Sequence, residues 1–319
     1  MTSSHKLILI TLFSLVIALS APWVGLSDIA DDILKQQILL DIRVPRVLFA
    51  FVAGAGLSLC GMVFQAMFHN PLATPFTLGV ASGASFGAAC SVFLGINVSL
   101  FGFDIITIGA FIGALVAITF VFFISQLQRG FSSETLLLTG VATSFFFSSL
   151  ILFIQYLSDM TDSFMIMRWL MGGLTSASYH SLLQLIPVVT VSTAIILWLS
   201  RELNLLMAGD DIALSRGVSV RQVRYLLFFS TSLCVGGIVA LSGPIGFIGM
   251  MVPHICRLII GTDHRWLTPA TIMFGGGFLI LCDGIARLLI APAEIPVGII
   301  TTLLGGPFFL WLLIKRRQA

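Results

Sequence analysis

Charged residues are scarce in this sequence. Of its 319 residues, 16 are Lys or Arg and 14 are Asp or Glu, so charged side chains make up only 9% of the chain, against about 25% in ordinary globular proteins. Hydrophobic residues make up 58%. A soluble domain of this size must cover its exterior with polar groups, and this chain has too few of them. The composition therefore excludes a soluble enzyme, a nucleic-acid binder and a disulfide scaffold, and it indicates a polytopic membrane protein.

Metal-binding and nucleotide-binding patterns are also missing. The five cysteines lie in apolar runs without a C-x-x-C pair, so we expect them to be packing residues. His69, His254 and His264 lie far apart without ligand spacing, so no metal site is predicted. A G-x-x-x-x-G-K-[ST] loop, which would hold nucleotide phosphates, does not occur. We therefore predict neither catalytic residues nor a cofactor in this chain; if ATP drives its function, another chain must bind the ATP.

Apolar runs separated by charged, proline or glycine-rich breaks divide the chain into ten candidate spans. A transmembrane helix needs about 20 mostly apolar residues, so the length suffices for this number. Residues 25–45 carry charges around an Ile/Leu pattern and predict a short amphipathic helix along the membrane surface. No repeat or linker divides the chain, so we predict one all-α membrane domain over residues 1–319. The spans are expected near residues 6–24, 46–68, 76–95, 104–126, 134–157, 181–200, 222–242, 246–261, 268–290 and 296–314.

The distribution of Lys and Arg predicts the orientation. Ten spans place both termini on one side of the membrane, and that side collects 11 of the 16 basic residues. Because basic loops stay in the cytoplasm, both termini are predicted to be cytoplasmic. The first apolar run is also compatible with a cleaved secretory signal, but it is long for a signal core, so we favour a retained helix.

The densest charged stretch, residues 201–224, lies on the predicted cytoplasmic side and holds seven of the 30 charges. Within it, residues 209–217 predict a short helix that exposes Ile212 and Leu214. Such a helix could dock a cytoplasmic partner. A solvated loop is the alternative, and charge and capping pattern alone do not decide between the two.

The ends of this short helix are predicted from three residues. Asp210 can cap the free N–H groups at its start, where negative charge is favourable. Gly217 suits the left-handed residue that ends a helix, and Arg216 lies near the negative helix end. The pattern therefore predicts an independent turn of helix between two longer ones.

Several charges lie near the outer ends of the spans. Arg43 and Arg46 at the entrance of the second span are explained most simply as headgroup anchors, and alternatively as a cationic pair that receives acidic side chains of a partner. Arg287 follows Asp283 by one helical turn and lies close to Glu294 in the sequence. We favour a neutralising Asp283–Arg287 pair over a proton relay.

Polar and small residues inside the spans have two interpretations. Thr135, Thr139 and Thr143 repeat at four-residue spacing and could line a translocation path, but bonding back to the helix backbone is the safer interpretation. G-x-x-x-G patterns at 83–87 and 109–113 predict close helix packing.

Ordered motifs run along nearly the whole chain. The most specific is Gly243-Pro-Ile-Gly-Phe-Ile-Gly-Met-Met-Val-Pro-His254, and the others are Gln65 and residues 43–46, 70–75, 78–84, 136–142, 169–173, 203–206, 209–210, 263–265, 293–298 and 305–311. With these motifs in this order, the chain resembles the permease subunits of bacterial ABC importers for iron chelates, haem and cobalamin.

The resemblance implies an assembly. Such permeases have ten membrane helices and pair around a central path, here with an identical or a sister subunit. Two cytoplasmic ATPase subunits, which bind ATP and Mg²⁺, dock on the loop helix, and a periplasmic or lipid-anchored binding protein delivers the substrate. The resemblance places the chain in the bacterial inner membrane among lipid, with no nucleic-acid partner, and it favours docking for residues 209–217.

The resemblance also assigns residues. It implies ATPase docking by Gly209, Asp210, Asp211, Ile212, Ala213, Leu214, Arg216 and Gly217. It implies binding-protein docking by Arg43 and Arg287. It implies a cytoplasmic gate of Asn70, Leu72, Ser133 and Glu134, and a path lined by Thr139, Thr143, Thr301 and Thr302.

The predicted function is therefore that of an importer permease, with an iron–siderophore as first candidate cargo and haem or cobalamin next. The alternative is an ion- or proton-coupled secondary transporter, which is expected to carry carboxylates on its path and broken helices. The acidic residues near membrane depth, Asp104, Asp283 and Glu294, lie towards outer span ends. A structural scaffold is disfavoured by the docking loop.

Overall fold

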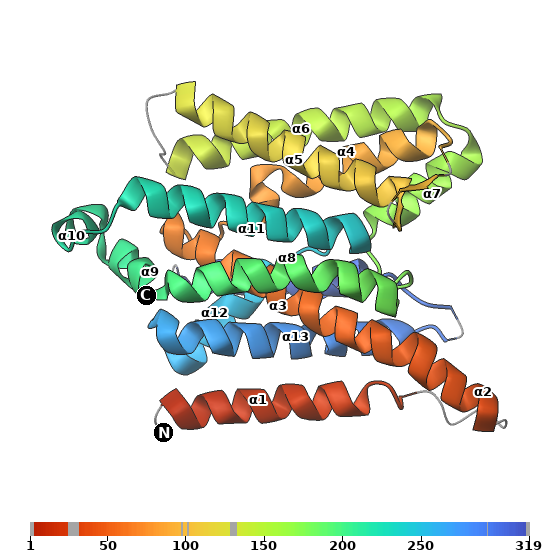
Figure 1. Ribbon diagram of the computed structural model, residues 1–319, viewed down its shortest axis with the longest axis horizontal. Helices are drawn as coiled ribbons and strands as arrows, with labels where there is room; N and C mark the ends of the chain where they lie inside the picture. Colours follow the sequence, from red (N-terminus) through yellow and green to blue (C-terminus); the bar gives the residue numbers. More distant parts are fainter. Residues whose placement is uncertain are drawn as a thin grey trace.

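The computed structural model describes residues 3–24, 32–96, 98–100, 102–127, 133–291 and 293–316. These residues form a layered bundle of helices that run roughly side by side (Figure 1). The elements are α1 (Ser3–Ser20), α2 (Asp32–Gln37), the π-helical η1 (Ile38–Arg43), α3 (Val44–Met67), the 3₁₀-helical η2 (Pro75–Leu78), α4 (Val80–Phe93), β1 (Ser99–Leu100), β2 (Phe103–Asp104), α5 (Ile105–Leu127), α6 (Ser133–Leu157), α7 (Met160–Leu170), α8 (Tyr179–Trp198), α9 (Ser200–Ala208), α10 (Asp210–Ser215), α11 (Val220–Ser242), α12 (Ile248–Ile260), α13 (His264–Leu288) and α14 (Val297–Arg316).

The ten predicted spans correspond to ten apolar helices of the described part. Seven are long and apolar enough to cross a membrane, counting Asp32–Met67 as one continuous helix, and three are shorter apolar helices. These shorter helices are Val80–Phe93, Ile248–Ile260 and Val297–Leu312. The β structure of the described residues is a hairpin of two short strands, β1 and β2. The prediction of an all-α membrane protein is confirmed.

The predicted surface helix at 25–45 is only partly correct. Residues 25–31 lie outside the described residues, and residues 32–43 continue into α3 without a break. Pro45, the last residue of the predicted surface helix, stands in the first turn of α3 just after the π-helical η1. A proline cannot make the usual helical hydrogen bond, and the wider η1 turn accommodates it. Tyr179 donates its hydroxyl proton to the carbonyl of Leu40 in this turn, at 2.9 Å.

Two short helices were not expected from the sequence. Helix α7 follows α6, and Asp159 caps it by accepting a hydrogen bond from the N–H of Asp162 at 2.8 Å. Helix α9 follows α8 directly after Leu199. Asp159 is a typical N-cap residue, so the sequence could have indicated the start of α7. Helix α9 has no side-chain cap, and it begins at the last residue of the span predicted over 181–200.

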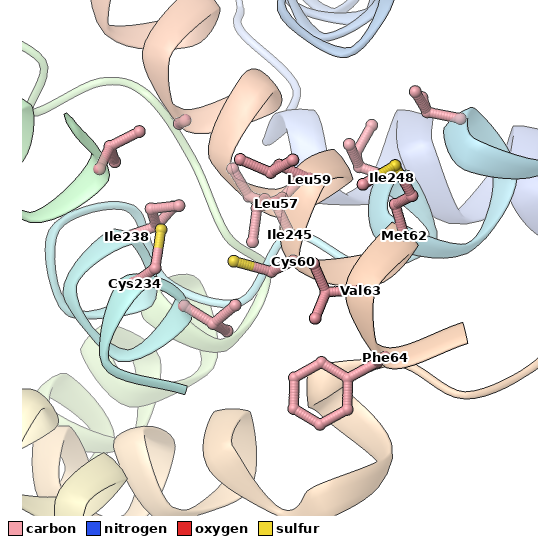
Figure 2. Packing of buried hydrophobic residues seen from close by; sticks show 14 of the residues in the cluster. Leu57, Leu59, Cys60, Met62, Val63, Phe64, Cys234, Ile238, Ile245 and Ile248 are labelled. Carbon is pink, nitrogen blue, oxygen red and sulfur yellow. The ribbon is translucent and has the colours of Figure 1, made fainter. Parts of the chain in front are cut away.

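Helix α3 lies at the centre of the bundle. Of its 24 residues, 20 are buried, and it packs against α8, α11, α12 and α13. Figure 2 shows part of this core, where Cys60 of α3 and Cys234 of α11 lie on facing sides of the contact. Among the described residues all five cysteines are free thiols, and Cys60 and Cys234 are almost fully buried. The interpretation of the cysteines as packing residues is confirmed.

The two G-x-x-x-G patterns pack against each other. Gly83 and Gly87 of α4 face Gly113 and Gly109 of α5, and a Cβ atom placed on Gly83 would lie 2.5 Å from the carbonyl oxygen of Gly113. The helix backbones therefore touch at these positions, as predicted. This close contact joins the layer of α4, α5 and α6 into one unit (Figure 1).

The two ends of the bundle differ. The N and C markers lie at the same end as α9 and α10, and α2 and α7 lie at the opposite end (Figure 1). Lys6 at the start of α1 donates a hydrogen bond to the carbonyl of Ile259 near the end of α12, at 2.6 Å. Helix α13 connects the two ends, because its 25 residues rise about 37 Å at 1.5 Å per residue.

Candidate functional site

The predicted docking helix is present as α10, and its end is built as expected. Gly217 has φ 80°; its N–H donates to the carbonyl of Leu214, and the N–H of Val218 donates to that of Ala213, both at 3.0 Å. This pattern is a Schellman motif, which requires a left-handed residue at the glycine position. Ala213 is fully buried, whereas Ile212 and Leu214 are 47% and 58% exposed. The helix thus presents two apolar side chains outward, as predicted.

The predicted capping role of Asp210 is wrong. Helix α10 has Gly209 as its N-cap and no side-chain cap. The carboxylate of Asp210 instead accepts a hydrogen bond from Arg224 of α11, at 2.8 Å. A charged partner forms a stronger hydrogen bond than a backbone amide does, and Arg224, whose side chain is 15% exposed, lies within reach. Asp210, the first residue of α10, therefore fixes the helix to α11 and does not cap its free N–H groups.

Helix α9 is attached to the membrane helices by a polar joint. Asn204 donates its amide N–H to Asp263 Oδ1 at 2.9 Å, and its amide oxygen accepts the backbone N–H of His264 at 3.0 Å. The same oxygen lies 2.7 Å from His264 Nδ1, which must carry the proton in this arrangement. A ring nitrogen of His69, at the end of α3, lies 2.8 Å from the carbonyl oxygen of Leu206. Asn204 therefore connects α9 to His264, the first residue of α13.

We expect substitution of Asn204 to release α9 while leaving α10 folded. The N–H of Arg265 and the amide of Asn204 hold the pKa of the Asp263 carboxyl below its usual range. The ionised carboxylate thus contributes to the stability of the folded joint at every pH above the ordinary Asp pKa of about 3.9, neutral pH included. This contribution is lost as the pH falls through the lowered pKa of the folded protein. At pH 7, Asn204→Ala is expected to speed amide hydrogen exchange in α9 about tenfold, because a hydrogen bond to a charged group is lost.

Asn204→Asp is expected to act more strongly than Asn204→Ala at pH 7, because two carboxylates would then face each other. Hydrogen exchange followed by mass spectrometry separates the α9 and α10 peptides, so α10 serves as the internal control. Equal exchange of α9 in the wild type and both variants would show that Asn204 is not the joint.

The predicted gate residues lie in two segments joined through η2. Asn70 accepts the backbone N–H of Leu72 with its side-chain oxygen at 3.0 Å, which shapes the turn after α3. Leu72 lines a cavity of about 280 Å³ together with Phe247. Ser133 is the first residue of α6, with its side chain outside the described part, and Glu134 is exposed in the first turn. Helix α6 packs on η2.

Three of the four predicted path threonines are buried within the protomer. Thr139, Thr143 and Thr301 are 9%, 2% and 0% exposed. Thr143 donates to the carbonyl of Thr139 at 2.7 Å, so the interpretation of backbone bonding is confirmed there. Thr302 of α14 is exposed, although its hydroxyl also donates to the carbonyl of Gly298 at 2.7 Å. Of the four, Thr302 is the one on the protomer surface.

A buried ion-pair cluster lies at the opposite end of the bundle. Arg46 of α3 donates to Asp283 of α13 through Nε at 3.1 Å and Nη2 at 2.8 Å, and to Glu294 through Nη1 at 2.7 Å. Arg287 Nε lies 3.1 Å from Asp283 Oδ2, an ion pair without good hydrogen-bond geometry. The side chains of Arg46 and Asp283 are 9% and 1% exposed. The predicted Asp283–Arg287 pair exists, but Arg46 is the principal partner of Asp283.

The two arginines predicted to receive a binding protein lie next to this cluster. Arg43 donates to the backbone carbonyls of Pro22, at 3.2 Å, and of Val24. Arg287 donates to the carbonyl of Ala21 at 3.3 Å. Both side chains are thereby held against the chain that follows α1, and both residues are half-buried.

The sequence of this chain is similar to those of known transport proteins. The model of the FecCD transport family matches residues 7–315. The chain belongs to the FecCD transport family. It is 40% identical over 283 residues to the hemin transport system permease protein HmuU of Yersinia pestis, with 88% of this chain and 84% of that protein covered. It is 37% identical over 297 residues to the molybdate import system permease protein MolB of Haemophilus influenzae, with 93% and 86% covered.

The fold of this FecCD protein also matches a solved structure. The structure is that of an ABC transporter described as of metal-chelate type in an inward-facing conformation, with a TM-score of 0.88 and 34% identity over 98% of this chain and 99% of that chain. The FecCD family consists of permease subunits of ABC transporters, so the chain is a transport component of the inner membrane. The alternative of an ion-coupled carrier is not supported.

Proposed function

We propose that this FecCD permease works as one of two permease subunits in an ATP-driven importer, together with two cytoplasmic ATPases and a substrate-binding protein. The observation that carries the proposal is α10, a separate short helix that ends in the Schellman motif at Gly217 and has two exposed apolar side chains. It lies at the same end of the bundle as the N and C markers (Figure 1). The basic loops at this end support a cytoplasmic location for it. Residues 209–217 are then the ATPase docking site.

The connections of the loop suggest how a signal would travel. The Asp210–Arg224 pair ties α10 to α11, and Asn204 ties α9 to the start of α13. ATP binding would draw the two ATPases together and shift both helices of the loop. The dimer would then switch between inward-open and outward-open forms, and ATP would favour one of them by differential binding.

At the other end, Arg43 and Arg287 are proposed to meet acidic side chains of the binding protein. Arg43, Arg46 and Arg287 bring three positive charges to this end of the bundle against the two carboxylates of Asp283 and Glu294, so the group has a net charge of +1 that would attract an added carboxylate. The path between two permease subunits would run along the exposed face of α14 at Thr302, and the segments at Asn70 and Glu134 would close its inner end.

The cargo is proposed from the relatives and from the solved structure. The two relatives named above carry hemin and molybdate in their names, at 40% and 37% identity, so similar permeases serve chemically different cargo. We propose a metal chelate, with an iron–siderophore first and haem or cobalamin next, supported by the match to a metal-chelate type transporter. Specificity would belong to the binding protein, and this chain would bind isolated substrate weakly.

Co-purification tests the proposal. The tagged chain is isolated from its native membranes, and its neighbours are identified by mass spectrometry. An ATPase subunit and a binding protein should be recovered, and the ATPase should be lost when α10 is disrupted. The recovered complex is then reconstituted and offered a ferric siderophore, haem, cobalamin and molybdate. Transport by the chain alone in ATP-free proteoliposomes would contradict the proposal.

A further inference from the structure

A cavity of about 320 Å³ lies between α5, α8 and α11, apart from the docking loop and the ion-pair cluster. Phe111 of α5 and Val188 of α8 form two of its walls, and Gly237 and Ala240 of α11 line it. Of its ten lining residues, two are polar, Thr107 and Gln184. The cavity is thus almost entirely apolar.

The cavity is a recess in an outward-facing surface. Leu226, Phe229 and Leu233 form an exposed stripe along α11, each at least 40% exposed. At helical spacing from Leu233, the small residues Gly237 and Ala240 follow on the same side of α11, and both are buried. A Cβ atom on Gly237 would already lie 3.2 Å from Val188. Gly237 therefore lets Val188 of α8 approach α11 closely, and Gly237 and Ala240 line the hollow without large side chains.

The three helices place the cavity at one depth of the membrane. Phe111 is six residues after the start of α5, Val188 is nine after the start of α8, and Gly237 is five before the end of α11. At 1.5 Å per residue these positions lie about 8 to 14 Å below the helix ends. Half of a hydrocarbon core is about 15 Å thick. All three walls therefore lie in the membrane leaflet opposite α10.

Water is a poor occupant of this space. A bound water needs two to four polar partners, whereas an apolar cavity of about 150 Å³ stays dry and takes up a benzene-sized molecule. This cavity has about twice that volume. An empty cavity would forfeit dispersion contacts along all of its walls. At this depth the available molecules of matching chemistry are lipid acyl chains.

A polar rim closes the end of the cavity near the membrane surface. Gln184 donates its amide N–H to the carbonyl of Gly102 at 3.0 Å, and His180 Nε2 lies 2.8 Å from the same oxygen. These contacts hold the β1–β2 hairpin against α8. His180 is exposed. Such a rim suits the ester and glycerol groups of a lipid. Among the described residues that line the cavity there is no Lys or Arg that would select an anionic headgroup.

We propose that this cavity is a binding site for one acyl chain of a phospholipid from the leaflet opposite α10. The chain lies between Phe111 and Val188 over Gly237 and Ala240, and its ester end lies at His180 and Gln184. The site recognises the hydrocarbon and not the headgroup charge. It does not depend on which cargo the protein transports.

Photolabelling tests the site. The full-length protein is reconstituted in phosphatidylethanolamine vesicles with a phospholipid that carries a diazirine in the middle of one acyl chain, and adducts are mapped by mass spectrometry. Labelling of Phe111 and Val188 is expected to exceed severalfold that of the neighbouring exposed residues Ile112 and Val191. Replacing half of the phosphatidylethanolamine by phosphatidylglycerol should not change this ratio.

Two variants fill the cavity from different walls, Ala240→Phe and Val188→Phe, so the test survives if one of them fails to fold. Both should reduce labelling of Phe111 to the level of Ile112. Leu233→Phe, on the same stripe of α11 but outside the cavity, is the matched control and should leave the ratio unchanged. Three results would each overturn the proposal. The first is uniform labelling of the whole face, and the second is labelling that neither filling variant changes. The third is a lack of labelling by the lipid diazirine together with cross-links to a second copy of the chain across this face.

Discussion

Asp283→Leu is expected to be the most destabilising single substitution in the ion-pair cluster of this FecCD permease. Asp283 is 1% exposed and faces both Arg46 and Arg287. Without it, two arginines remain near a single carboxylate, Glu294, so buried positive charge is left uncompensated. Removing one partner of a buried pair typically costs about 3–5 kcal/mol, and this is the expected loss of stability.

The cluster predicts an order of effects as well as a size. Arg46→Met leaves Asp283 paired with Arg287 and lets Glu294, 40% exposed, turn towards water, so its effect should be smaller. Glu294→Gln should cost about 1 kcal/mol or less, because a partly exposed pair contributes little. Arg168→Met, at an exposed arginine in α7, is the matched control and should be neutral.

Thermal unfolding in detergent measures this order. A thiol-reactive fluorogenic dye is a suitable probe, because four of the five cysteines are buried and become reactive only on unfolding. The melting temperature should fall in the order Asp283→Leu, Arg46→Met, Glu294→Gln, from largest to smallest decrease. A decrease for Glu294→Gln as large as that for Asp283→Leu would mean that charge balance does not hold this cluster together.

The spans and helix α10 could be predicted because their signals are local. An apolar run of about 20 residues indicates a span wherever its neighbours lie, and the pattern around Gly217 specifies a helix end within a few residues. The exposure of Ile212 and Leu214 followed from the same short segment. These features needed no knowledge of which helices pack together.

The joints between helices could not be predicted because their partners are distant in the sequence. Arg46 and Asp283 are 237 residues apart, and Asn204 and Asp263 are 59 apart. Periodicity shows which face of a helix is apolar, but not which neighbour meets it. Asp210 illustrates the consequence: its local pattern predicted a cap, and Arg224, 14 residues away, provides the stronger partner.

The helix boundary predicted between residues 45 and 46 was wrong for a related reason. A proline after a charged segment usually starts a helix, and the sequence gives no sign that the preceding turn widens to a π-helix. The hydroxyl of Tyr179, bound to the carbonyl of Leu40, comes from a helix more than 130 residues away. This tertiary hydrogen bond thus holds η1, the turn that joins the two segments where a helix boundary was expected.

The apolar side chains of α10, rather than its ion pair, are expected to carry ATPase docking. Ile212→Glu combined with Leu214→Glu should reduce transport about a hundredfold or more, because central interface residues typically contribute about 2 kcal/mol or more each. Both side chains are about half exposed, so the isolated permease should stay folded. Co-purification of the ATPase and ATP-dependent uptake by the reconstituted complex measure the two effects.

Two matched variants separate docking from folding. Ile212→Val combined with Leu214→Met keeps the apolar surface and should retain near-normal transport. Asp210→Ala removes the 2.8 Å pair with Arg224, which is partly exposed and contributes less than about 1 kcal/mol, so transport should fall only severalfold. If Asp210→Ala instead abolished ATPase binding while the double glutamate variant kept it, the orientation of α10 through Arg224 would be the decisive element, and its exposed apolar pair would be incidental.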